Sequence, residues 1–151
     1  MDKLNLPDFE LKICEQNGKP CIFDPIRKKW VAATPEEFVR QHFVNYLVTC
    51  KSYPLSHIAN ETAITIGNVN KRCDSVVYDK CGKPKIILEY KAPSVKIDNK
   101  VFAQISRYNI SLKVDYLIVS NGMNHYCLKV DYNTGRCTFL PDIPDYNSIQ
   151  R

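Results

Sequence analysis

The chain has 151 residues, of which 44% are hydrophobic and 25% are charged, a balance typical of one soluble globular domain spanning 1–151. No apolar run approaches the roughly 20 residues of a membrane-spanning helix. The first residues contain no apolar segment of the signal-peptide type, so we expect a cytoplasmic protein with no membrane partner. The net charge of +5 is compatible with a polyanionic partner but does not single one out.

The cysteines and histidines do not form a recognisable metal or redox motif. The seven cysteines are odd in number and irregularly spaced, with no C-x-x-C pair. Without an export signal, this pattern predicts reduced thiols and argues against a zinc site. His42, His57 and His125 are scattered and have neither HxH nor HExxH spacing.

A hairpin and a helix are expected in the first third of the chain. Residues 9–14 and 19–23 flank Asn17-Gly18, and an Asn-Gly pair favours a tight turn between two strands. Thr34 is a typical N-cap, Pro35 suits the first helical position, and Glu37 completes a capping box. The apolar residues of this helix share one face, which predicts packing against an apolar surface: Val39, Phe43, Tyr46 and Leu47.

The middle of the chain alternates strands with turns. We expect strands over 61–66, 71–78 and 85–91, and the residue pattern over 99–112 is helical. The nearly all-apolar run 116–120 is typical of a strand buried on both faces. A strand, a helix and a buried strand in this order predict a right-handed parallel crossover.

The last third of the chain completes the expected fold. Residues 125–131 and 136–140 predict a second hairpin, and the Pro-, Asp- and Asn-rich tail 141–151 is expected to be loosely held. Together the elements predict an α/β (α+β) fold, in which helices flank a mixed β-sheet. An N-terminal hairpin region occupies 1–33.

Two carboxylates and a lysine on neighbouring strands are the residues most suggestive of chemistry. Glu89 and Lys91 point to the same side of one strand, because strand side chains alternate. A hairpin with the preceding strand can place Asp74 beside Glu89. An isolated Glu-x-Lys in a strand is usually a solvated ion pair. This strand, however, is apolar enough to lie inside a sheet, where charges need partners or a ligand.

Such a group of side chains can bind a hard divalent cation. Mg²⁺ prefers oxygen ligands and keeps several waters, so two carboxylates and a substrate phosphate suffice. A cation also relieves the repulsion between neighbouring carboxylates. A metal-activated water can attack a phosphodiester while a lysine orients it. Asp74, Glu89 and Lys91 therefore predict a nuclease site.

Gln104 and Tyr108 are a second pair of interest. They are four residues apart and stack on one face of the predicted helix. The periodicity is equally consistent with two arrangements. In the first arrangement, Tyr108 lies in the core and Gln104 at its margin. In the second, both side chains reach toward the site and the phosphate backbone.

In order and spacing, these residues resemble the PD-(D/E)xK nuclease superfamily. More narrowly, they are similar to the nuclease domain at the N-terminus of type I restriction enzyme R subunits. The segments that carry the resemblance are Thr34–Gln41, Lys71–Asp74, Glu89–Pro93, Gln104-x-x-x-Tyr108 and Asn121-Gly122. The resemblance runs from about Pro35 to Tyr126, which makes 34–126 the family-like core.

The resemblance implies a restriction-endonuclease-like fold and a Mg²⁺-dependent DNA endonuclease, with Mn²⁺ as a second candidate cation. It implies that Asp74 and Glu89 bind the metal and that Lys91 positions the attacking water. Gln104 and Tyr108 match a further motif that lies near the site and the DNA.

A glutamate from the first helix often completes such sites. Here Glu37 is favoured over Glu36, although the capping box explains Glu37 without any role in catalysis. Glu61, near the start of a strand, is a lesser candidate, and a surface strand residue is its simpler interpretation.

The sequence departs from the full-length family pattern because it contains no G-x-x-x-x-G-K-[ST]. ATP dependence is therefore not carried over. The partners implied are DNA and the motor or specificity subunits of a restriction system. The alternative hypothesis is a non-catalytic DNA- or protein-binding module on the same fold, which needs such a partner for cleavage.

Overall fold

The computed structural model describes the backbone of residues 3–66 and 68–150, and their side chains except at positions 64, 66, 69, 71 and 107–112. The strands are β1 (Ile13–Gln16), β2 (Lys19–Asp24), β3 (Lys29–Ala32), β4 (Ile58–Ile66), β5 (Val69–Tyr78), β6 (Pro84–Tyr90), β7 (Tyr116–Ser120), β8 (His125–Asp131) and β9 (Arg136–Leu140). The helices are α1 (Pro35–Cys50) and α2 (Asn99–Leu112), with short 3₁₀ helices η1 (Leu55–His57) and η2 (Tyr146–Ile149).

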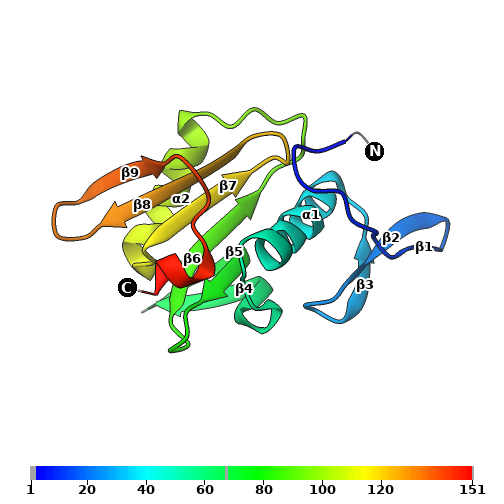
Figure 1. The fold of residues 1–151 in the computed structure, drawn as a ribbon, viewed down its shortest axis with the longest axis horizontal. Helices are drawn as coiled ribbons and strands as arrows, with labels where there is room; N and C mark the ends of the chain where they lie inside the picture. The colour runs from blue at the N-terminus through cyan, green and yellow to red at the C-terminus, as the bar shows by residue number, and fades with distance from the viewer. Residues whose placement is uncertain (1–2, 67, 151) are drawn as a thin grey trace.

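A six-stranded mixed sheet, in the order β4-β5-β6-β7-β8-β9, forms the centre of the molecule (Figure 1). Every neighbouring pair is antiparallel except β6 and β7, which are parallel and joined through α2. The predicted mixed sheet with flanking helices is confirmed. The strands β4 and β5 are longer than expected, because they begin three and two residues earlier, at Ile58 and Val69.

The two α-helices cover opposite faces of this sheet. On β6, Ile86, Leu88 and Tyr90 belong to the core that includes α1, whereas Ile87 belongs to the core that includes Ile105 of α2. Alternate residues of β6 are therefore buried on opposite faces, as expected of a central strand. All five residues of β7 are buried, as the apolar run predicted.

Helix α1 begins as the sequence predicts. Thr34 is the N-cap, and its hydroxyl accepts a hydrogen bond from the Glu37 backbone N–H at 3.1 Å. The other half of the predicted capping box is wrong, since the Glu37 carboxylate contacts the side chains of Arg27, Arg40 and Gln41 instead. Val39, Phe43 and Leu47 are fully buried on the predicted face.

A second, three-stranded sheet of order β1-β2-β3 lies beside α1 (Figure 1). Its first turn has Asn17 and Gly18 in the left-handed region, at φ values of 53° and 76°, as an Asn-Gly turn requires. The hairpin begins at Ile13 rather than near Phe9, and a third strand, β3, extends it. Among the described residues, no helix is both long and apolar enough to cross a membrane.

The expectation of a loosely held tail is wrong. Tyr146 and Ile149 of η2 are buried in the α1 core, at 4% and 0% exposure. The Tyr53 hydroxyl donates to the Pro144 carbonyl at 2.7 Å, and the Tyr146 backbone N–H donates to the Lys51 carbonyl at 3.0 Å. Composition suggested a loop, but two apolar side chains at helical spacing fix it against the core.

The tail is therefore expected to contribute to stability. Ile149→Ala removes a fully buried side chain and should lower the free energy of unfolding by about 2–4 kcal/mol. Asn147→Ala, at an exposed position of the same turn, should change it by less than about 0.5 kcal/mol. Urea denaturation measures both, and equal effects of the two substitutions would contradict a packed tail.

Candidate active site

The pairing of β5 with β6 brings the sequence-predicted carboxylates together. Ser75 lies opposite Leu88, so the next position along the strands places Asp74 beside Glu89. The Tyr90 backbone N–H donates to Asp74 Oδ2 at 2.9 Å, which ties this side chain to β6. Lys91 directly follows β6, and its Nζ lies 3.3 Å from Glu89 Oε1.

The end of β6 opens into a pocket of about 480 Å³. Its wall is made by β3, the first turns of α1, and the strands β4, β5 and β6. The predicted residues Asp74, Glu89, Lys91 and Glu37 all line it, as do Glu36 and Glu61. The remaining lining residues are Arg27, Val31, Ala32, Thr34, Arg40 and Tyr90.

The carboxyl groups of Asp74 and Glu89 hold their protons more tightly than usual. Burial raises the pKa of Asp74, against the opposing hydrogen bond from the Tyr90 N–H. Burial also raises the pKa of Glu89, with Lys91 opposing the shift and the charge of Asp74 adding to it. Burial thus disfavours the charged form of both carboxyl groups, and repulsion by Glu61 at Asp74 and by Asp74 at Glu89 adds to it. A bound cation would offset both effects.

Glu37 is held by three side chains. The Arg27 guanidinium donates from Nη2 to Glu37 Oε1 at 2.5 Å, and the Gln41 amide donates to Oε2 at 2.9 Å. Arg40 Nε lies 3.2 Å from Oε2 in an ion pair. Glu37 is only 5% exposed, so these contacts neutralise a carboxylate that is nearly removed from water.

Arg40 extends this network into the sheet. Its Nη1 donates to the Asp74 carbonyl at 2.6 Å, and its Nη2 donates to Glu61 Oε1 at 2.8 Å. Glu61 has a left-handed φ of 52°, and the β4–β5 register contains no Glu61–Asp74 pair. This interruption leaves the Asp74 carbonyl to accept from Arg40.

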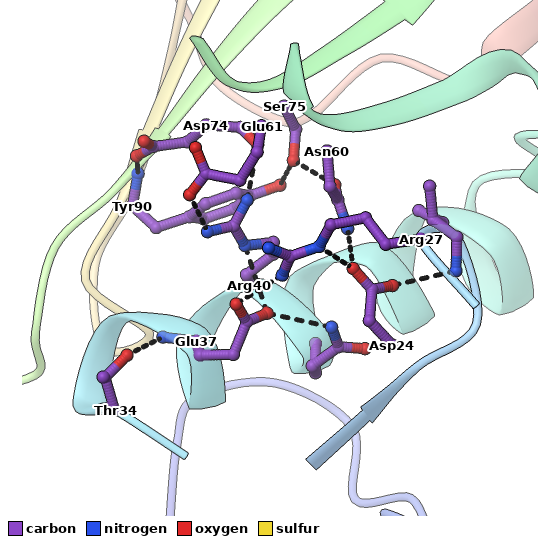
Figure 2. A network of polar contacts seen from close by, with 12 residues as sticks. Asp24, Arg27, Thr34, Glu37, Arg40, Asn60, Glu61, Asp74, Ser75 and Tyr90 are labelled. Atoms are coloured by element: carbon purple, nitrogen blue, oxygen red, sulfur yellow. Dashed lines mark hydrogen bonds and ion pairs between the residues drawn. The ribbon is translucent and has the colours of Figure 1, made fainter. Parts of the chain in front are cut away.

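A second set of hydrogen bonds connects Asp24 to Tyr90, the residue beside Asp74, through the strands of the large sheet (Figure 2). Asp24, with no exposed surface, accepts from Arg27 Nε and, at 3.1 Å, from the Asn60 amide. The Ser75 hydroxyl donates to Asn60 Oδ1 at 2.7 Å, and the Tyr90 hydroxyl donates to Ser75 Oγ at 3.0 Å. Burial raises the pKa of Tyr90, which keeps its hydroxyl a donor.

Comparison with protein families matches residues 35–144 to the type I restriction enzyme R protein N terminus (HSDR_N). This match covers well over half of the chain. The chain belongs to this family.

The structural comparison agrees with the family at the level of the fold. The HSDR_N chain superposes on the fragment structure of a putative HsdR subunit of a type I restriction enzyme from Vibrio vulnificus YJ016, with a TM-score of 0.56 and 19% identity. That match covers 76% of this chain and 24% of the Vibrio chain, so this chain spans about a quarter of its neighbour's length.

A second solved structure, described as the cryoEM structure of the DrdV–DNA complex, matches with a TM-score of 0.44 and 17% identity. It covers 72% of this chain and 11% of that one. Comparison with curated proteins gives no match. The predicted family and the restriction-endonuclease-like fold are thus confirmed by the family match and by the Vibrio structure.

The donor set of this candidate site fits a hard cation that retains solvent ligands. Among the described side chains, no group of three or more His, Cys, Asp or Glu residues is arranged to hold a metal ion. Asp74 and Glu89 supply oxygen donors from neighbouring strands. Mg²⁺ needs only one or two carboxylates when waters and a substrate phosphate complete its shell. The site therefore suits Mg²⁺ or Mn²⁺ better than a metal that requires a closed protein cage.

The remaining predicted residues lie elsewhere or cannot be placed. Gln104 is exposed on α2, and none of the described α2 residues lines the pocket. The Tyr108 side chain lies outside the described residues, so its predicted position stays a prediction. Glu36 is exposed at the pocket rim, whereas Glu37 is engaged by Arg27, Gln41 and Arg40.

Sequence reasoning missed the residues that hold the site together. Arg40 lies three residues after Glu37, and that helical spacing could have indicated an ion pair. The contacts of Asp24 with β4 and of Arg27 with α1 carry no comparable signal, because those partners are distant in sequence. The Asp24–Asn60 contact, for example, joins residues 36 positions apart.

Asp24 is expected to stabilise the HSDR_N fold in a pH-dependent way. Asp24→Ala removes the acceptor of Arg27 Nε and of the Asn60 amide N–H and should cost about 3–5 kcal/mol of unfolding free energy at pH 7. Burial raises the pKa of Asp24, but hydrogen bonds from Arg27, Asn60 and the Ile26 N–H outweigh it, so the pKa lies below the ordinary 3.8. The contribution is thus complete above that value and is lost as the pH falls through the lowered pKa.

Urea denaturation of both proteins between pH 7 and pH 3 measures this difference. The difference in unfolding free energy between wild type and Asp24→Ala should become smaller as the pH falls below about 4. Asp8→Ala, which removes an exposed carboxylate paired with Lys3, is the control and should have little effect at any pH. A difference in unfolding free energy that becomes larger in acid would contradict the stabilising role of ionised Asp24.

Proposed function

We propose that the chain is a Mg²⁺-dependent DNA endonuclease domain of restriction-enzyme type. Membership of the HSDR_N family supports a nuclease-type role in restriction. The observation that carries the proposal is the strand register that sets Asp74 beside Glu89, with Lys91 next to Glu89, all lining one pocket.

In this proposal, Asp74 and Glu89 hold the cation. A bound Mg²⁺ would act as a Lewis acid on the scissile phosphate and would lower the pKa of a water. The raised pKa values of both carboxyl groups support this role, because they reflect charge that the protein itself leaves only partly compensated. Tyr90 orients Asp74 through its backbone N–H.

Lys91 positions the nucleophile. An ammonium has three donors, so it can hold Glu89 and also donate to a water or a phosphate oxygen. Its positive charge also favours the approach of the polyanionic backbone. Glu37 serves the site indirectly, since its carboxylate is engaged by Arg27 and Arg40. Gln104 and Tyr108 remain proposed contacts to DNA from α2.

The partners follow from the family. DNA is the proposed substrate, and motor or specificity subunits of a restriction system are the proposed protein partners. The chain corresponds to about a quarter of the Vibrio HsdR fragment, which suggests that a larger assembly directs cleavage. On its own, the domain is expected to nick DNA slowly and without sequence preference.

The proposal predicts metal-dependent nicking that requires two of these side chains. Glu89→Gln removes a proposed ligand, and Lys91→Met removes the positioning ammonium while keeping its length. Each should reduce Mg²⁺- or Mn²⁺-stimulated nicking of supercoiled plasmid by about 100-fold or more. Glu15→Gln and Lys19→Met change the same residue types at exposed positions of the β1–β2 hairpin and should have no effect.

Calorimetric titration of Mg²⁺ into the same proteins separates the alternatives. Binding lost in Glu89→Gln together with nicking supports the proposal. Full nicking in both site variants rejects it. Metal binding that depends on Glu89 without nicking under any condition favours the non-catalytic binding module.

A further inference from the structure

Asp74 is held from two directions by residues that lead back to a single buried carboxylate. Its carbonyl accepts from Arg40 Nη1 at 2.6 Å, and its side chain accepts from the Tyr90 N–H at 2.9 Å. Each of these two contacts is the end of a chain of polar contacts that begins at Asp24 (Figure 2).

The first chain runs through charged side chains. Asp24 accepts from Arg27, and Arg27 in turn donates to Glu37 at 2.5 Å. Glu37 pairs with Arg40 at 3.2 Å, and Arg40 reaches the Asp74 carbonyl. This chain links the three-stranded sheet, the first turns of α1 and strand β5.

The second chain runs through neutral groups of the large sheet. Asp24 accepts from Asn60 on β4, Asn60 accepts from Ser75 on β5, and Ser75 accepts from the Tyr90 hydroxyl on β6. The Arg40 guanidinium lies 5.7 Å from the centre of the Tyr90 ring, which joins the two chains near the site. Together the two chains close a ring of polar contacts that includes Asp74 itself.

We propose that this ring positions Asp74, so that Asp24, Arg27 and Arg40 are positioning residues of the proposed metal site. The three-stranded sheet then belongs to the functional unit, although Asp24 and Arg27 precede the 35–144 segment matched by the family. This inference rests on the proposed function, because it assigns the ring a role toward the cation that Asp74 and Glu89 would hold.

Burial and chemistry favour positioning over stabilisation alone. Asp24, Glu37 and Arg40 are 0%, 5% and 5% exposed. Replacing such buried ion pairs by well-packed apolar residues is often neutral or stabilising, so stability by itself does not require them. A ring of hydrogen bonds closed by the Glu37–Arg40 ion pair fixes orientation as apolar packing cannot, and outer contacts of this kind set the geometry of metal ligands.

The experiment compares substitutions inside and outside the ring. Arg40→Lys cannot reach the Asp74 carbonyl, Glu37 and Glu61 together, and Arg27→Met breaks the link from Asp24 to Glu37. Both should weaken Mg²⁺ binding by about 10- to 100-fold in calorimetry. Arg72→Met is the matched control, because Arg72 bonds Glu61 outside the ring and its side chain is 70% exposed.

Two further measurements distinguish positioning from general loss of structure. Amide exchange at Tyr90, measured without metal, should accelerate in both ring variants and not in the control, because its N–H loses a fixed acceptor. Nicking by the ring variants should recover as the Mg²⁺ concentration is raised, whereas a partly unfolded protein would not recover. Arg27→Lys, which retains the charge, should restore part of the affinity.

The outcomes separate the two proposals. Wild-type protein that binds Mg²⁺, with ring variants that bind equally well and show unchanged Tyr90 exchange, overturns the ring and leaves the nuclease proposal standing. Wild-type protein that binds no Mg²⁺ overturns the nuclease proposal and with it the role of the ring toward a cation. Weakened binding in the ring variants with an unchanged Arg72→Met control supports the inference.

Discussion

The register between β5 and β6 is the constraint on which the candidate site depends. Because side chains alternate along a strand, a slip of one residue would move Asp74 to the other face of the sheet and away from Glu89. Two features hold the register. Neighbouring residues of both strands are buried on opposite faces, as Val76 and Val77 show on β5. The connecting turn is also fixed, since Asp79 Oδ1 accepts from the Lys83 and Cys81 N–H groups at 2.9 and 2.8 Å.

The carboxyl groups around this site fall into two classes, according to the direction in which their pKa values are shifted. Carboxylates that are paired with arginines, such as Asp24 and Glu61, have lowered pKa values despite the opposing effect of burial. Asp74 and Glu89 differ, since burial raises their pKa values beyond what Tyr90 and Lys91 compensate. The fold thus satisfies its structural carboxylates and leaves two adjacent ones in need of positive charge. Shifted pKa values of this kind are typical of functional sites.

The sequence predicted the parts of the site that depend on local pattern. Strand alternation placed Glu89 with Lys91, the hairpin placed Asp74 near them, and capping chemistry located the start of α1 at Pro35. The capping contact predicted for the Glu37 side chain is replaced by others, because its carboxylate is engaged by Arg27, ten residues earlier on another element, and by Arg40 and Gln41.

The remaining misses have the same cause. Nothing near Asp24 indicates that it contacts Asn60, and nothing in the composition of the tail indicates that Ile149 enters the core. Such contacts form only when segments distant in sequence pack together. A single sequence contains periodicity and turn signals, but it does not indicate which distant residues will be in contact. The fold class was therefore predictable, whereas the supporting polar network was not.

Crystallography with Mn²⁺ tests the central claim most directly, because anomalous scattering locates the ion independently of activity. We expect a peak about 2.0–2.3 Å from carboxylate oxygens of both Asp74 and Glu89, within the pocket beside Lys91. A fully soaked crystal with no peak there, or with Mn²⁺ bound only at other carboxylates, would contradict the assignment of this site as a metal-dependent nuclease centre.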